Sequence, residues 1–126
     1  MNIIHNGHGG QPSELRTSTF TGVVYADPVL GETDGAAVTR VFFGPGGRTY
    51  WHSHSAGQLL LAVAGKGLIC VRGGEAEVIA EGDVVWSPPG EVHWHGGGPA
   101  TTLMHLAVSL GTATWLAEVT DEEYSG

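Results

Sequence analysis

The chain is poor in cysteine, in positive charge and in long hydrophobic runs. Its single cysteine, Cys70, has no partner for a disulfide within the chain, which fits a reducing compartment. Thirteen acidic residues against five basic ones give a net charge of −8. Because phosphate binding needs a positive surface, nucleic acid and anionic membranes are poor partners for this chain.

No apolar run is long enough to cross a bilayer, and the first residues lack the basic flank and apolar core of a signal peptide. We therefore expect a soluble cytoplasmic protein whose partner is a small-molecule substrate. A length of 126 residues fits one domain with one core. Residues 5–13 are rich in Gly, His, Gln, Pro and Ser, so we expect a flexible N-terminal arm over residues 1–15 and a single domain over residues 16–126.

Glycine is abundant, at 21 residues, and this composition predicts short strands joined by tight turns. Regular spacing of such strands indicates a sandwich or a barrel. Residues 112–124 mix apolar and acidic side chains and predict a short amphipathic helix. The expected strands cover residues 20–26, 37–43, 48–54, 58–64, 67–72, 75–80, 83–87, 92–95 and 101–109.

Two histidines one residue apart, His52 and His54, are the main chemical feature of the sequence. In a strand, residues i and i+2 point to the same side, so both imidazoles would face one point. A third imidazole from His93 and an oxygen from Gln58 would complete a ligand set for a divalent metal. The alternative, satisfied polar histidines without a metal, requires burying several unpaired imidazoles at a high cost.

The spacing around these residues resembles the two signature motifs of the cupin superfamily. The first reads G-x5-H-x-H-x3,4-E-x6-G and the second G-x5-P-x-G-x2-H-x3-N. The chain departs from them at Gln58, where the family has Glu, and at Gly97, where it has Asn. The matching positions are Gly46, His52, His54 and Gly65 in the first motif and Gly82, Pro88, Gly90 and His93 in the second.

The resemblance implies an all-β cupin jelly-roll barrel, here with a short C-terminal helix. It also implies one divalent metal ion per chain, held by His52, His54, Gln58 and His93. Manganese is the metal we expect first, and Fe, Zn, Ni and Co also suit such ligands. Because Gln58 is neutral, the metal would keep its full charge and act as a Lewis acid, which weighs against activation of oxygen.

Strand parity gives further candidates inside the barrel. His95 shares a face with His93, and His105 lies on the inward face of the last long strand, where a neutral imidazole can exchange a proton. We expect His105 to be the catalytic base, and His95 or Thr49 to orient the substrate; a histidine bonded to backbone is the alternative. The expected apolar lining is Val41, Phe43, Leu60 and Leu103.

Longer segments, over about residues 20 to 124, resemble a group of small bacterial cupins that includes manganese-dependent (R)-selective hydroxynitrile lyases. That resemblance implies reversible cleavage of a cyanohydrin to an aldehyde and cyanide. A polyketide cyclase or isomerase, a cupin dioxygenase and a non-enzymatic small-molecule sensor are the alternatives. Since cupins often pair through N-terminal strands, we also expect a homodimer or homotetramer.

Overall fold

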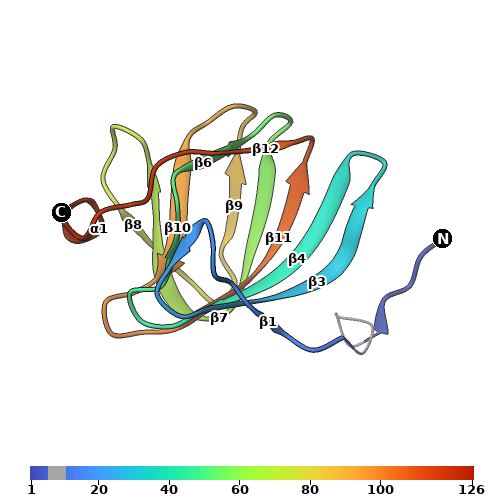
Figure 1. Cartoon of the computed structure of the whole chain (residues 1–126), viewed down its shortest axis with the longest axis horizontal. Helices are drawn as coiled ribbons and strands as arrows, with labels where there is room; N and C mark the ends of the chain where they lie inside the picture. Colours follow the sequence, from blue (N-terminus) through green and yellow to red (C-terminus); the bar gives the residue numbers. More distant parts are fainter. Residues whose placement is uncertain (6–10) are drawn as a thin grey trace.

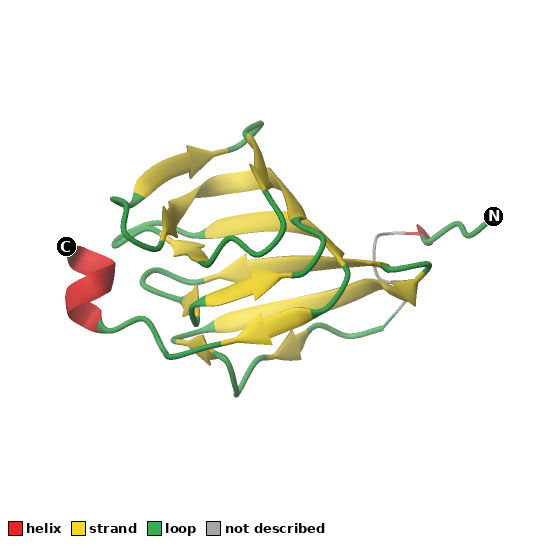
Figure 2. Cartoon of the chain, turned by 90° about the horizontal axis from the view of Figure 1, so that it is seen from above, coloured by secondary structure: helices red, strands yellow, loops and turns green. Residues whose placement is uncertain are grey.

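A computed structural model describes residues 1–5 and 11–126, and within them a 12-stranded antiparallel sheet curls on itself (Figure 1). One short helix, α1, follows at the C-terminal end, on the opposite side of the molecule from the N-terminus (Figure 2). The elements are β1 (Glu14–Leu15), β2 (Phe20–Thr21), β3 (Val24–Thr33), β4 (Ala36–Phe43), β5 (Arg48–Thr49), β6 (His52–His54), β7 (Gln58–Val71), β8 (Glu77–Ala80), β9 (Val84–Ser87), β10 (His93–Gly97), β11 (Leu103–Leu110), β12 (Ala113–Trp115) and α1 (Asp121–Ser125).

The strands follow the order β1-β3-β4-β11-β7-β10-β5-β2, with β8 and β9 also paired to β7 and with β6 beside β10 and β12. The neighbours β11 and β7, and β7 and β10, are far apart in sequence, so the sheet closes around an interior lined by alternate residues of each strand. The prediction of an all-β barrel with a short C-terminal helix is confirmed.

Strand β7 passes through a predicted turn. The expected strands over residues 58–64 and 67–72 left a break between them, but β7 is continuous. It pairs with β11 and β9 in its first part and with β10 and β8 in its second. Gly65 lies at the corner with a φ of +80°, and a Cβ there would collide with the carbonyl oxygen of Thr102. The glycines therefore bend a strand that changes layers rather than ending it.

Strand β3 likewise continues through Pro28, where a break was expected. Among the described residues, the outer neighbour β1 pairs only with Tyr25 and Ala26, so the missing N–H of Pro28 costs no ladder bond with β1. The expected strands over residues 20–26 and 48–54 are each split in two, into β2 and β3 and into β5 and β6.

The prediction of a helix over residues 112–124 is wrong for the first part of that range. Residues Ala113–Trp115 form β12, because β6 offers an open edge against which their backbone pairs. The helix starts only after Thr120, whose hydroxyl accepts a hydrogen bond from Glu123 N at 3.1 Å, while the Glu123 carboxylate accepts one from Thr120 N at 3.0 Å. This capping box fixes the start of α1.

Within the predicted arm, Glu14 and Leu15 pair with β3 as strand β1, while residues 6–10 lie outside the described residues. The flexibility of the arm and its boundary at residue 15 stay predictions. Among the described residues, no helix has the length and apolar character needed to cross a membrane.

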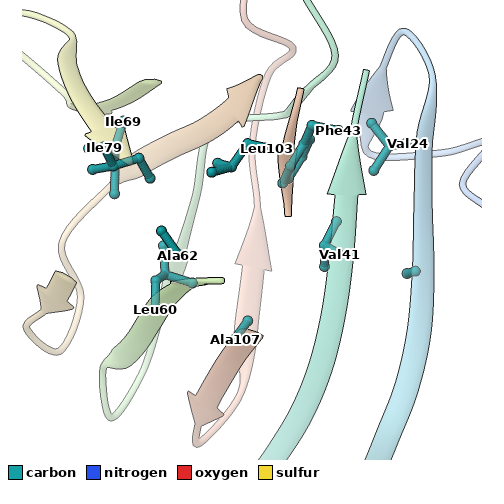
Figure 3. Packing of buried hydrophobic residues seen from close by; sticks show 10 residues of the cluster. Val24, Val41, Phe43, Leu60, Ala62, Ile69, Ile79, Leu103 and Ala107 are labelled. Atoms are coloured by element: carbon teal, nitrogen blue, oxygen red, sulfur yellow. The ribbon is translucent and has the colours of Figure 1, made fainter. Parts of the chain in front are cut away.

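A hydrophobic core fills one part of the barrel interior (Figure 3). Its side chains alternate with outward residues along β3, β4, β7 and β11, as strand geometry requires. The core leaves the remaining inward positions, which carry the histidines, around a cavity. The buried core residues are Val24, Ala26, Val41, Phe43, Leu60, Ala62, Ile69, Ile79, Leu103 and Ala107.

Candidate functional site

Four buried histidines from two paired strands meet inside the barrel. Strand β6 carries His52 and His54, β10 carries His93 and His95, and the register places His93 opposite His52. One ring nitrogen from each of His52, His93 and His95 lies within 4.8 Å of the others. The His54 ring centroid is 5.1 Å from that of His52. The strand parity expected from the sequence therefore places these imidazoles together.

Gln58, the first residue of β7, joins this cluster. Its amide oxygen lies 3.1 Å from His93 Nε2, and its amide nitrogen donates to Ser109 Oγ at 3.1 Å. The structure thus brings together all four residues expected as ligands. The three imidazoles whose ring nitrogens lie closest to one another are those of His52, His93 and His95; they include His95, expected as a catalytic residue, and not His54, expected as a ligand.

Backbone carbonyls orient two of the rings. His52 Nδ1 lies 2.8 Å from the carbonyl oxygen of Tyr50, and His93 Nδ1 lies 3.2 Å from that of Glu91. A carbonyl accepts a hydrogen bond, so each contact favours a proton on Nδ1 and leaves Nε2 with a free lone pair. Second partners of this kind are typical of metal-ligating histidines.

Burial keeps these imidazoles neutral. Desolvation, with the neighbouring histidines, lowers the pKa of His52 to about 3 and that of His93 to about 4. A neutral His93 has one N–H, yet its two nitrogens face two acceptors, the Glu91 carbonyl and the Gln58 amide oxygen. With the Gln58 amide oxygen toward His93 Nε2, one of these two contacts joins two lone pairs, and a divalent cation bound by both atoms would relieve it.

His54 adds a further unsatisfied nitrogen. Its Nε2 is buried and has no hydrogen-bond partner among the described residues. An orphaned ring nitrogen beside a cluster of neutral imidazoles and an amide oxygen fits a metal ligand. Three imidazoles, those of His52, His93 and His95, could therefore hold a divalent metal, and the His54 ring and the Gln58 amide oxygen offer further donors beside them.

A second histidine pair lies beside this set. His105 Nε2, from β11, is 2.9 Å from His95 Nδ1, and both side chains are buried. Burial lowers the pKa of His105 to about 4 and that of His95 well below its usual value. Thr49 Oγ1 accepts a hydrogen bond from the His95 backbone N–H at 3.2 Å. Two neutral rings can share only one proton across their contact, so one outer nitrogen of the pair keeps a lone pair.

The cluster opens into a cavity of about 350 Å³. Of the expected apolar lining, Val41 borders this cavity, whereas Phe43, Leu60 and Leu103 lie in the core, because the cavity occupies only part of the interior. The lining residues are Leu15, Arg16, Thr17, Ser18, Thr19, Phe20, Ala26, Thr39, Val41, Thr49, His52, His54, Gln58, His95, His105, Ala107, Ser109 and Trp115.

The sequence did not reveal the part of the wall that comes from the two ends of the domain. The Trp115 ring on β12 lies against the His52 ring in a tilted arrangement, with ring centroids 4.6 Å apart, and the centroid of the Phe20 ring on β2 is 5.7 Å from that of Trp115. Residues 15–20, with Arg16 among them, also border the cavity. The apolar residues around Trp115 suggested a helix, and no local pattern marked residues 15–20 as a wall.

Comparisons with known proteins agree with this geometry. A family model described as "Cupin domain" matches residues 39–106, which include every candidate ligand. The chain is a cupin. Over 111 residues it is 48% identical to a protein named (R)-mandelonitrile lyase from Granulicella tundricola, covering 83% of this chain and 85% of that protein.

Solved structures show the same fold. A cupin-like protein of Thermotoga maritima is 40% identical, has a TM-score of 0.85, and the match covers 90% of this cupin and 92% of that chain. The polyketide cyclase RemF from Streptomyces resistomycificus is 20% identical with a TM-score of 0.75, and the match covers 99% of this cupin and 91% of RemF. At that identity the likeness to RemF shows the fold alone.

Proposed function

We propose that this cupin is a metal-dependent lyase of the hydroxynitrile type, which cleaves a cyanohydrin to an aldehyde and cyanide and catalyses the reverse reaction. The observation that supports this proposal most is the cluster of buried imidazoles from His52, His93 and His95, with the Gln58 amide against His93 and the His105 ring against His95. The 48% identity to a protein named (R)-mandelonitrile lyase supports the same reaction class.

The proposed metal site consists of His52, His54, Gln58 and His93 and would hold one divalent ion, manganese first. Such an ion, when bound, supplies Lewis acidity that lowers the pKa of a substrate hydroxyl. The uncharged ligands leave its positive charge uncompensated, which favours an alkoxide.

In this proposal the His95–His105 pair accepts the hydroxyl proton. Because both rings are buried and neutral, the pair has a free ring nitrogen at neutral pH, and the 2.9 Å contact lets the second ring stabilise the proton taken by the first. Thr49 holds the backbone of His95 and so acts as a positioning residue. The rings of Trp115 and Phe20 offer an apolar surface for the substituent of the aldehyde.

The test is release of benzaldehyde from (R)-mandelonitrile by manganese-loaded protein. We expect His105→Gln to lower kcat by about 100- to 10,000-fold, the usual range for general acid–base catalysis, without changing metal content. His5→Gln, which alters a histidine on the N-terminal arm, is the matched control and should leave kcat unchanged. A rate no higher than background with fully loaded wild-type protein would contradict the lyase proposal.

A further inference from the structure

The cavity wall holds one charged side chain that the proposed reaction leaves unused. Arg16 borders the cavity, and its Nε is buried without a hydrogen-bond partner among the described residues. The only ion pair found for its guanidinium in the described part of the chain is a 3.8 Å contact between Nη1 and the Glu14 carboxylate. That carboxylate is 59% exposed, so the pairing is weak.

The backbone holds Arg16 at this wall. Arg16 N donates to the carbonyl oxygen of Val24 at 2.8 Å, and farther along the segment the Thr19 carbonyl accepts from Tyr50 N at 2.9 Å. Residues 15–20 are thereby tied to β3 and to the loop before β6. The Arg16 side chain is 35% exposed, which leaves its guanidinium between solvent and the cavity.

The charge of the cavity differs from that of the whole chain. The chain has a net charge of −8, but no Asp or Glu lies among the described residues that line the cavity. Hydroxyl groups, neutral imidazoles, the Gln58 amide and one guanidinium make up its polar wall. A partly buried guanidinium with an unpaired donor is costly unless a ligand supplies an acceptor, and its planar fork matches a carboxylate.

We propose that Arg16 forms an anion subsite in this cavity. The inference rests on the proposed function only in using the same cavity for substrate. The anion has two possible sources: a carboxylate at the far end of the substrate, or the cyanide that leaves beside the hydroxyl-bearing carbon. Both present a negative charge to the guanidinium. A neutral cyanohydrin with an unsubstituted ring has no carboxylate, so only its leaving cyanide would interact with Arg16.

Two pairs of unreactive probes separate these sources. (R)-Mandelate and (R)-mandelamide differ in charge beside the hydroxyl carbon, whereas 4-(hydroxymethyl)benzoate and 4-(hydroxymethyl)benzamide differ in charge at the far end. Calorimetry with manganese-loaded protein would give the Kd of each probe for wild type and for Arg16→Gln, Arg16→Lys and Arg72→Gln. The last variant removes the same charge outside the cavity, where Arg72 lies over the Trp51 ring.

We expect Arg16→Gln to weaken binding of at least one carboxylate about tenfold or more, and of its matching amide less than twofold. Arg16→Lys should restore part of the loss, and Arg72→Gln should have no effect. A loss confined to mandelate assigns the subsite to the leaving cyanide, and one confined to 4-(hydroxymethyl)benzoate assigns it to a substrate carboxylate.

The inference is overturned if neither carboxylate binds wild type more tightly than its amide, or if Arg16→Gln weakens acids and amides equally. Binding is measured without turnover, so this result is independent of whether mandelonitrile is cleaved. Equal metal content in all variants shows that a lost affinity does not reflect a lost ion.

Discussion

At the scale of single residues, the site is a set of imidazoles kept neutral by burial. His52 and His105 are each at most 1% exposed, and burial is the largest cause of their lowered pKa values. In the unfolded chain the same rings would titrate near 6.5. This difference couples protonation to folding, because the unfolded state binds more protons wherever the pH lies between the two pKa values.

The metal-free protein should therefore lose stability as the pH falls below 6.5. With folded pKa values of about 4 for His93 and His105 and about 3 for His52, the loss continues down to about pH 4 for the first two histidines and to about pH 3 for His52. Each histidine contributes a slope of about 1.4 kcal/mol per pH unit once the unfolded ring is protonated. Urea unfolding of chelator-treated protein between pH 7.5 and 5 measures this slope. His105→Leu should reduce the slope by the contribution of one histidine. A free energy of unfolding that stays constant over that range would contradict the pKa assignment.

At the scale of elements, hydrogen bonds from the buried side chain of Arg48 hold the C-terminal segment against the barrel. Arg48 on β5 donates from Nη2 to the carbonyl oxygen of Val119 at 2.7 Å and to the Asp121 carboxylate at 2.9 Å, and its guanidinium lies 4.7 Å from the Tyr124 ring centroid. Tyr124 in turn donates to the Gly97 carbonyl at 2.7 Å. These contacts hold the segment that brings Trp115 to the cavity.

Arg48→Ala should lower the free energy of unfolding by about 2–4 kcal/mol, because it removes charge-assisted hydrogen bonds and leaves the buried Val119 carbonyl without its donor. Asp121→Asn is the matched comparison. The Asp121 side chain is 99% exposed, so its loss of charge should leave stability close to wild type. Denaturant unfolding of both variants measures the difference, and an equal effect of the two substitutions would show that the ion pair, and not the buried carbonyl contact, fastens the segment.

Element boundaries show what the sequence could reveal. The expected strands over residues 37–43 and 101–109 match β4 and β11 to within two residues at each end, because glycine- and proline-rich turns flank them in the sequence. The pairing of residues 113–115 with β6 depends on an open strand edge distant in sequence, which no local pattern encodes. Gly65 and Gly67 predicted a turn between two strands. In the structure they bend one strand between two layers, and this outcome depends on the strands packed around them.

At the scale of the whole molecule, glycine and proline spacings placed His52, His54, Gln58 and His93 in one site, because the family motif constrains turns as well as ligands. Arg16 could not be assigned a role in the same way, because the pairing of residues 14–15 with β3 brings it to the cavity. The homodimer or homotetramer stays a prediction, and so does the cytoplasmic location.

Elemental analysis of the purified protein shows whether the chain binds one divalent metal through His52, His54, Gln58 and His93. After loading with excess manganese, we predict one divalent ion per chain in wild type and in His5→Ala, and none in His52→Ala. Wild-type protein that holds no metal after loading, or His52→Ala protein that retains a full equivalent, would contradict a metal site built on these residues.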